Sequence, residues 1–388
     1  MSPTRTIAEN VEAQLPRYLV ELEQLVNIDC GSYTPEGVNR VADFCADAFG
    51  ALGASVERLP AERLGDLVIG RLAGEGPRLL LIGHMDTVFD PGTAAERPFR
   101  RDGDRALGPG VTDMKGGLLA GFHALAALKA AGVAPAVTYV CNPDEEIGSP
   151  FSGPHIRRLA AEHDAALVLE CARANGDIVS ARKGIADYHV EITGRAAHAG
   201  VEPEKGRSAI LEAAHKVLAL TALNGRWPSV TVNVGVIEGG TRPNVVAARC
   251  GLKVDLRAAS VVEFDAAATE LERIVTTASV DGTHATLDRV AGHQPMERSP
   301  AIARLVGLAQ QVAGELGFSV NDAATGGASD ANTCAAVGLP VLDGLGPIGG
   351  DDHSPDEWLD VTSIGPRTAL LAGVITRIGE ALQVRGPM

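Results

Sequence analysis

Imidazole and carboxylate side chains recur along this chain at the ends of short apolar segments. In chain order they are His84, Asp86, Asp113, Asp144-Glu145-Glu146, Glu170 and His353. A divalent cation takes about four nitrogen or oxygen ligands, and one carboxylate can bridge two cations. A further carboxylate that stays free can serve as a general base. The pattern therefore predicts a two-metal centre that activates water.

The first of these segments, His84-Met85-Asp86, directly follows the apolar run at 79–82. A ligating imidazole needs its second nitrogen held, and Asp86 can accept that hydrogen bond, which fixes the tautomer. Taken alone, the pair would be read as a histidine beside a polar turn. The acidic partners further along the chain favour a ligand role for His84.

Asp113 lies in the glycine-rich segment 108–117, directly before a predicted helix. Without further context, a helix N-cap and a bridging carboxylate are equal alternatives for this residue. The segment lacks the GxGxxG pattern, which disfavours a dinucleotide site.

Glu145 and Glu146 follow the apolar run at 137–140. Adjacent carboxylates at the edge of a sheet repel one another unless a cation or a shared proton offsets the charge. One of them can bind a metal while its neighbour takes a proton from water. A solvated acidic loop is the alternative interpretation.

The elements that must position these residues read as strands alternating with helices. Apolar runs at 67–69, 79–82, 137–140 and 166–169 predict buried strands, and 117–131 and 154–161 predict helices. Continuous apolar runs are typical of strands covered on both faces, which indicates a layered α/β domain. Ligands in such sheets gather outside the carboxyl ends of the strands. We therefore expect His84, Glu145, Glu146 and Glu170 at one edge.

From Gly184 the pattern changes to an alternating strand and then to a different order of elements. The predicted elements lie at 185–193, 207–222, 230–237, 248–256, 262–277 and 284–290. This order is βαββαβ, a compact sheet with helices. After Ser299 the layered pattern returns. We predict a catalytic domain formed by 1–183 and 296–388, with 184–295 inserted as a lid or dimerisation domain.

Composition limits the class of protein. A chain of 388 residues with 45% hydrophobic residues suits two globular domains, and a net charge of −15 argues against nucleic-acid binding. The sequence contains no run of eighteen or more apolar residues, so no membrane span is predicted. Residues 1–10 lack the apolar core of a signal peptide, so we expect a cytoplasmic protein. The six cysteines form no CxxC pair and are expected to be reduced and mostly buried.

The motifs together resemble the dinuclear zinc exopeptidase and deacylase family. That family includes glutamate carboxypeptidase, aminoacylase, acetylornithine deacetylase, succinyl-diaminopimelate desuccinylase and tripeptidase. The matching segments are 83–88 (GHMDTV), 108–117 (GPGVTDMKGG), 144–149 (DEEIGS), 194–200 (GRAAHAG), 326–330 (GGASD) and 353–354 (HS). They occur in family order across nearly the whole chain, with the strongest likeness to glutamate carboxypeptidase.

The resemblance implies a mixed-sheet zinc-exopeptidase catalytic domain with an inserted ferredoxin-like lid or dimerisation domain. It also implies two zinc ions per subunit, for which cobalt or manganese can substitute. His84, Asp113 and Glu170 would hold one ion. Asp113, Glu146 and His353 would hold the other. Asp86 would orient His84, Glu145 would be the general base, and the peptide after Asp113 is often cis in relatives.

Further roles also rest on the resemblance alone. It implies that His198 donates to the developing oxyanion, across a homodimer, although its spacing favours an ordinary surface or core histidine. Arg257 and Asn244 would bind the free carboxylate of the substrate, with backbone N–H groups of Gly326 and Gly327. For Arg257 a surface ion pair is the alternative.

The expected reaction is hydrolysis of the amide bond next to a free C-terminal carboxylate. The substrate would be a small peptide or an N-acyl amino acid, and glutamate or a similar amino acid would be released. The alternatives within the family are a deacylase of N-acyl amino acids and a dipeptidase. A non-catalytic metal-binding scaffold would have lost ligands or base, and a nucleotide-dependent enzyme would carry a phosphate-binding loop; neither feature is found.

Overall fold

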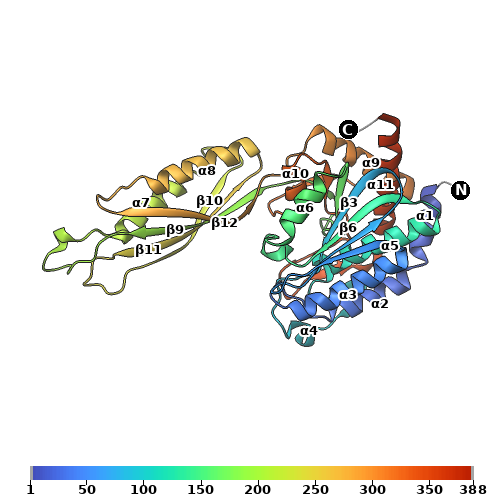
Figure 1. The fold of residues 1–388 in the computed structure, drawn as a ribbon, viewed down its shortest axis with the longest axis horizontal. Coiled ribbons are helices and arrows are strands. Elements are labelled where there is room, and N and C mark those ends of the chain that lie inside the picture. Colours follow the sequence, from blue (N-terminus) through green and yellow to red (C-terminus); the bar gives the residue numbers. More distant parts are fainter. Residues whose placement is uncertain (1–2, 386–388) are drawn as a thin grey trace. The chain divides into compact units, whose positions relative to one another are not determined.

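The computed structural model describes residues 3–385, and the chain divides into two compact units. Unit 1 comprises Met1–Ser180, Arg298–Ala324 and Ser329–Met388. Unit 2 comprises Ala181–Glu297 and Thr325–Ala328. Figure 1 shows the elements of each unit along the chain, and each unit is described by itself.

Unit 1 alternates strands and helices in its first half and is mainly helical after the insertion. Its helices are α1 (Pro3–Glu12), α2 (Leu15–Val26), α3 (Pro35–Leu52), α4 (Thr93–Glu96), η1 (Val111–Lys115), α5 (Gly116–Ala130), η2 (Glu145–Ile147), α6 (Ser152–Ala160), α9 (Pro300–Leu316), α10 (Asp330–Ala336), η4 (Val361–Ser363) and α11 (Ile364–Arg385). Its strands are β1 (Ser55–Leu59), β2 (Leu67–Leu72), β3 (Glu75–His84), β4 (Arg100–Asp102), β5 (Arg105–Leu107), β6 (Pro135–Asn142), β7 (Ala165–Val168), β14 (Val341–Leu342), β15 (Gly349–Gly350) and β16 (Trp358–Asp360). Two further strands, β8 (Ile178–Arg182) and β13 (Asp322–Thr325), pair with each other.

The main sheet of unit 1 has six strands in the order β1-β2-β6-β3-β7-β14. β6, β3, β7 and β14 run parallel, whereas β1 and β2 are antiparallel to their neighbours. In register, His84 at the end of β3 pairs with Asn142 at the end of β6, and Ile82 pairs with Val168 at the end of β7. The carboxyl ends of these strands therefore share one edge.

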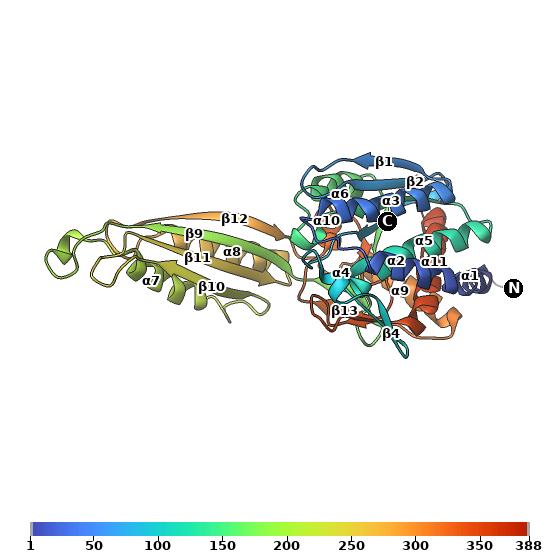
Figure 2. The same ribbon diagram turned by 90° about the horizontal axis from the view of Figure 1, so that it is seen from below.

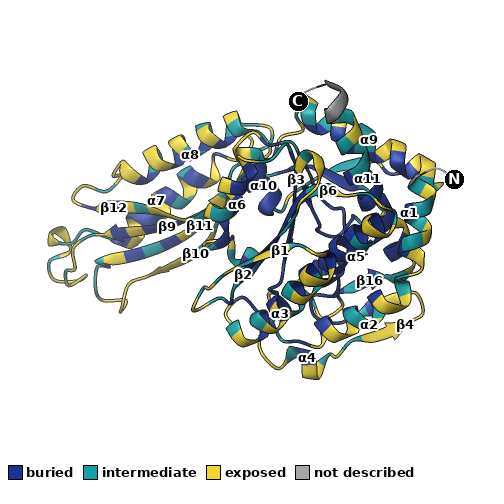
Figure 3. Ribbon diagram, turned by 45° about the vertical axis from the view of Figure 1, so that its right-hand side comes forward, coloured by how far each residue is buried: buried dark blue, intermediate teal, exposed yellow. Residues whose placement is uncertain are grey.

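Helices cover both faces of this sheet, since the consecutive residues 79–84 of β3 and all of β7 are buried. Helix α5, which is almost entirely buried, packs on β3 and on α11, and α3 packs on β2. Helix α10 packs on β7 and on α6. Figure 3, coloured by burial, shows these helices around the buried strand β3, and Figure 2 shows the same helices from below. The strands that end at this edge are thus fixed in place by helices packed on both faces of the sheet.

A second sheet in unit 1 was not predicted. It has the order β15-β16-β5-β4 and consists of strands of two or three residues. Its central pairing joins residues 105–107 to residues 358–360, so it ties the segment before Asp113 to the segment after His353. Strands this short carry too few residues to show a period of two in the sequence.

Unit 2 is an antiparallel sheet with two helices on it. β9 (Gly184–Thr193), β10 (Thr231–Gly239), β11 (Arg249–Ala258) and β12 (His284–His293) take the order β10-β11-β9-β12. Helices α7 (Ala209–Thr221) and α8 (Val261–Thr276) pack on it and on each other, and the short turn η3 (Pro203–Lys205) precedes α7. Alternate residues of β9 are buried, which leaves one face of the sheet for the helices.

The predicted mixed-sheet α/β class and the βαββαβ order of the insertion are both confirmed. All six cysteines are free and buried, as expected. Within residues 3–385, the structure contains no helix that is long and apolar enough to cross a membrane.

Candidate metal centre

The carboxyl edge of the main sheet delivers the candidate ligands of unit 1. His84 is the last residue of β3, and Glu145 and Glu146 form the short turn η2, which follows β6. Glu170 lies two residues past the end of β7. Parallel strands end at a common edge, so three segments distant in sequence meet there. The expected clustering of these residues is what the structure contains.

The first group of ligand atoms lies around Nε2 of His84. This nitrogen is 3.0 Å from Oδ1 of Asp113 and 3.7 Å from Oε1 of Glu170. Zinc bonds of about 2.0–2.1 Å in a tetrahedron place neighbouring ligand atoms about 3.3 Å apart. The spacing therefore suits one cation between the three side chains.

The second group lies on the other oxygen of the same carboxylate. Nε2 of His353 is 3.1 Å from Oδ2 of Asp113 and 3.1 Å from Oε2 of Glu146. Ligand atoms of His84, Asp113 and Glu146 all lie within 4.8 Å of one another. Each oxygen of Asp113 thus faces a different imidazole, which is the arrangement of a bridging carboxylate.

The hydrogen-bond partners of His84 show why a cation fits this position. Its Nδ1 lies 3.0 Å from the backbone carbonyl oxygen of Asp86, which can only accept. The neutral ring therefore carries its proton on Nδ1 and presents a lone pair on Nε2 to the oxygen of Asp113. This 3.0 Å contact needs positive charge between the two atoms. Burial lowers the pKa of His84, but hydrogen bonds to Asp113 and Asp86 raise it well above its ordinary value, so a second proton on the ring supplies that charge and a bound cation would replace it. Oε1 of Glu146 is likewise buried without a hydrogen-bond partner.

The pKa values of the clustered side chains also indicate that the site favours positive charge. Burial raises the pKa of the Glu146 carboxyl to about 7, and the charge of Asp113 adds to this effect. Hydrogen bonds to Asp113 and Glu146 raise the pKa of His353 to about 11. Burial alone would raise the pKa of Asp113, but hydrogen bonds from His353 and His84 hold it below its ordinary value. Bound cations would relieve this crowding of carboxylates.

Glu145 lies beside the candidate ligands, but its carboxylate belongs to neither the group of ligand atoms around His84 nor the group around His353. Burial raises the pKa of its carboxyl well above the ordinary value; His84 opposes this, while the charges of Glu170 and Asp330 increase it. A carboxylate with a raised pKa beside a metal centre suits a group that takes and returns a proton.

Asp86 differs in detail from the expectation. The carbonyl oxygen of Asp86 is nearer to Nδ1 of His84 than its carboxylate is, at 3.0 Å against 3.4 Å. The carboxylate accepts the backbone N–H groups of Glu145 and Glu146, at 3.1 and 3.2 Å, and the hydroxyl of Ser32 at 2.7 Å. Asp86 therefore contacts both His84 and the turn that carries Glu145 and Glu146. Its neighbour in the acidic run, Asp144, instead accepts N–H groups at the start of α6.

The backbone at His353 is in a conformation that non-glycine residues rarely adopt. Its φ is 62°, and that of nearby Asp351 is 57°. Such residues cost on the order of 1–3 kcal/mol each and cluster at functional sites. The Asp113–Met114 peptide bond is cis, as the resemblance implied.

His198 and Asn244 lie on neighbouring segments of unit 2. The backbone N–H of Ala199 donates to the carbonyl of Asn244 at 3.0 Å, and His198 forms an isolated bridge with Val245. Nδ1 of the exposed His198 accepts the N–H of Gly200 at 3.1 Å. The neutral ring therefore carries its proton on Nε2, which makes this atom a hydrogen-bond donor.

Arg257 and the two glycines are also brought together in unit 2. Nη1 of Arg257 donates to the carbonyl of Gly326 at 3.0 Å, and Nη1 of Arg182 donates to that of Gly327 at 3.1 Å. Arg257 is also paired with Asp255 at 3.1 Å, which matches the alternative of an ion pair. The arginines therefore engage the carbonyl groups of the glycines, whereas the expected anion contact used their N–H groups.

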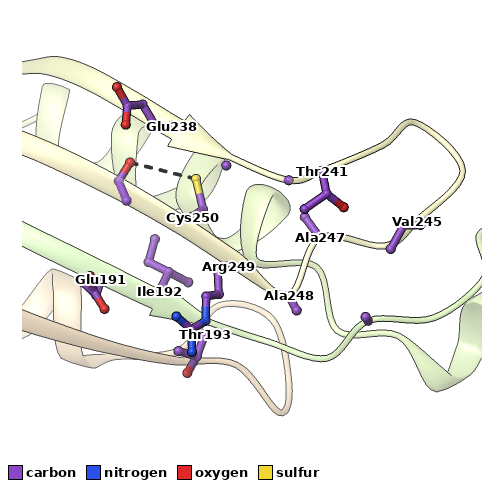
Figure 4. A pocket seen from close by; sticks show the side chains of 14 residues that line it. Glu191, Ile192, Thr193, Glu238, Thr241, Val245, Ala247, Ala248, Arg249 and Cys250 are labelled. Atoms are coloured by element: carbon purple, nitrogen blue, oxygen red, sulfur yellow. Dashed lines mark hydrogen bonds between the residues drawn. The ribbon is translucent and has the colours of Figure 1, made fainter.

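A cavity of about 510 Å³ lies in unit 2 around the ends of β9, β10 and β11. Figure 4 shows its lining, which includes Glu191, Glu238, Arg249 and Val245. In the described part of the chain, the groups of side chains able to hold a metal include His84, Asp113 and Glu146 but none from this lining. The candidate catalytic centre is thus the one in unit 1.

Sequence reasoning missed several buried polar residues around the centre. Asp330 accepts from the hydroxyl of Ser149 at 2.7 Å and from the amide of Asn142. Asp330 lies in the motif at 326–330, and this motif is the signal that could have found it. Lys115 likewise lies in the matched segment 108–117, whereas Glu357 lies in none of the matched segments; both hold the loop of Asp113.

The fold and the site define a metal-dependent hydrolase, and the chain belongs to peptidase family M20/M25/M40, whose model matches residues 80–377. The chain is 34% identical over 372 residues to carboxypeptidase G2 from Pseudomonas sp. (strain RS-16), covering 94% of this chain and 90% of that protein. It is 26% identical over 388 residues to acetylornithine deacetylase from Proteus mirabilis, covering 93% and 97%.

Solved structures share the fold. Aminopeptidase PepT from Bacillus cereus superposes with a TM-score of 0.79 at 23% identity, covering 94% of this chain and 98% of that one. At this identity the likeness establishes the architecture and leaves the substrate open.

Proposed function

We propose that this protein is a dinuclear zinc metallopeptidase of the carboxypeptidase type. It hydrolyses the amide bond next to a free C-terminal carboxylate and releases glutamate or a similar amino acid from small peptides or N-acyl conjugates. The observation that carries the proposal is the sharing of Asp113 between two imidazoles, each with a further carboxylate, at 3.0–3.7 Å. The likeness to carboxypeptidase G2 over 94% of the chain supports the carboxypeptidase type.

When bound, the two zinc ions activate water and polarise the scissile carbonyl. The chain supplies the rest. His84, Asp113 and Glu170 hold one side of the centre, and Asp113, Glu146 and His353 hold the other. Glu145 takes the proton of the attacking water and returns it to the leaving amine. Its turn is fixed by the carboxylate of Asp86.

His198 in this proposal donates Nε2–H to the developing oxyanion, and a homodimer supplies it to the partner's site. Two features of unit 2 support a dimer. Helix α7 exposes Leu211 and Leu218, which are 51% and 71% exposed. β10 is an edge strand whose outer backbone groups can pair with a second copy. Arg257 and Asn244 are proposed to bind the free carboxylate of the substrate.

Replacement of His198 by Ala is expected to lower kcat by about 10²- to 10³-fold, the usual loss for one oxyanion donor, with metal content unchanged. Mixing this variant with Glu145→Gln tests the dimer. If His198 acts across the dimer, one hybrid site contains both residues and activity returns. If both residues act within one subunit, the mixture stays inactive.

A panel of zinc-reconstituted hydrolysis assays tests the proposed substrate class. We expect turnover of N-acyl-glutamate and N-acyl-aspartate and little turnover of N-acyl-ornithine or of dipeptides that lack a C-terminal glutamate or aspartate. Because the acetylornithine deacetylases are also relatives, the deacylase is the second candidate. Release of small acyl groups from any amino acid would support it and contradict the carboxypeptidase type.

A further inference from the structure

The loop that carries Asp113 is held by two buried side chains of opposite charge, neither of which is a candidate metal ligand. The carboxylate of Glu357, 1% exposed, accepts the backbone N–H groups of Gly110, Thr112 and Asp113 at 2.8, 2.9 and 3.1 Å. The N–H of Asp113 is thus fixed by a residue 244 positions away. Charge-assisted bonds of this kind are about twice as strong as neutral ones.

Lys115 binds the same loop through a carbonyl group, whereas Glu357 binds it through N–H groups. Its ammonium, 1% exposed, donates to the carbonyl groups of Pro109 and Ile28, each at 3.1 Å. The peptide between Pro109 and Gly110 therefore has its oxygen on the cation and its N–H on the anion of Glu357. The dipole of that peptide is aligned between the two charges, so each charge strengthens the contact made by the other.

Gly110, on the N–H side of this peptide, leaves no room for a side chain. Gly110 has a φ of 72°, and a Cβ there would lie 2.6 Å from Cγ2 of Thr87 and 3.1 Å from the carbonyl oxygen of Asp113. Glycine is the residue that adopts this conformation without cost. The turn that presents Asp113 is thus packed on one side and bonded at both ends.

Glu357 also belongs to the segment that carries His353. It lies four residues after that histidine and directly before β16, whose residues pair with β5 ahead of the loop. The indole N–H of Trp358 donates to the carboxylate of Asp351 at 3.0 Å, which fastens the backbone on the other side of His353. One carboxylate thereby connects the two segments whose side chains face each other as Asp113 and His353.

We propose that Glu357 and Lys115 form a positioning pair that sets the metal affinity of the centre by fixing Asp113 against His353. The pair touches neither substrate nor reacting atoms; it acts through the loop. The inference rests on the ligand assignment proposed above. Partners outside the ligand set commonly contribute 10- to 100-fold in metal affinity, and rigid support of this kind is how they do so.

The test is the affinity of the purified full-length protein for Zn²⁺, measured by competition with a chromophoric chelator. Glu357→Gln keeps the shape but turns an amide N–H₂ toward backbone N–H groups. We expect zinc to bind about 10- to 100-fold more weakly. The absorption spectrum of the cobalt-loaded protein should change as well, because it reports ligand geometry.

Unit 2 offers a matched control. Glu212, 1% exposed, accepts the N–H groups of Ser279 and Val280 and pairs with Lys216, itself 1% exposed. Glu212→Gln thus removes a buried carboxylate that accepts backbone N–H groups, as Glu357→Gln does, but from a unit without candidate metal ligands. It should lower the unfolding midpoint of the metal-free protein and leave zinc affinity and the cobalt spectrum unchanged.

A second variant covers the case in which Glu357→Gln does not fold. Lys115→Met removes the other charge, and it should also weaken zinc binding. In the double variant the losses should be less than additive, since both act on one peptide. Wild-type zinc affinity in a folded Glu357→Gln or Lys115→Met protein would overturn the proposal. Asp113→Asn distinguishes failure of the positioning role from failure of the ligand assignment. If this variant also binds zinc normally, the ligand assignment itself is wrong.

Discussion

Replacing Glu145 by Gln is expected to reduce kcat by about 10²- to 10⁴-fold while both metals stay bound. The amide keeps the size of the side chain but cannot take a proton from water. The candidate ligands are untouched, and the backbone N–H of residue 145 still reaches Asp86. Activity is measured on the best substrate of the panel, with metal content determined on the same sample.

The control for this variant is Glu145→Asp, which keeps the carboxylate but withdraws it by one methylene. It should retain part of the activity that Gln loses. Near-normal turnover by Glu145→Gln with two metals bound would show that another group is the base. Loss of metal together with activity would make Glu145 a ligand.

The second large effect is expected from Asp113→Asn. Each oxygen of Asp113 faces a different imidazole, at 3.0 and 3.1 Å, and an amide offers one oxygen in place of two. Metal affinity should fall by more than the roughly 10- to 100-fold typical of an outer partner, and turnover should be lost with it. Metal content after dialysis and zinc affinity by chelator competition measure the effect.

A comparison with Glu170→Gln shows whether Asp113 is the shared ligand. Oε1 of Glu170 lies 3.7 Å from Nε2 of His84, so Glu170 is assigned to the first group of ligand atoms. Its replacement should weaken one metal and spare the other, whereas Asp113→Asn should weaken both. Equal loss of a single metal in the two variants would contradict the bridging role.

Much of the fold could be predicted because the buried strands are long enough to show their pattern. The run at 79–82 and the alternation of β9 each indicated their class of sheet, and both predictions are confirmed. The meeting of His84, Glu146 and Glu170 followed from the rule that parallel strands end at one edge. The roles assigned to these residues stay predictions.

Other features depend on contacts that sequence cannot display. Glu357 reaches Asp113 only because two strands of three residues pair across the chain. The nearer partner of His84 is the backbone carbonyl oxygen of Asp86. Every residue has such a group, so the residue type does not show which one is used. The carbonyl groups of Gly326 and Gly327 face arginines for the same reason: peptide orientation is set by the folded backbone.

The central claim is that two cations share Asp113, and crystallography at the zinc absorption edge tests it most directly. Anomalous difference maps of zinc-loaded crystals should show two peaks about 3.5–4 Å apart. One should lie among His84, Asp113 and Glu170, and the other among Asp113, Glu146 and His353. A single peak at saturating zinc, or two peaks that do not both contact Asp113, would contradict the two-metal account.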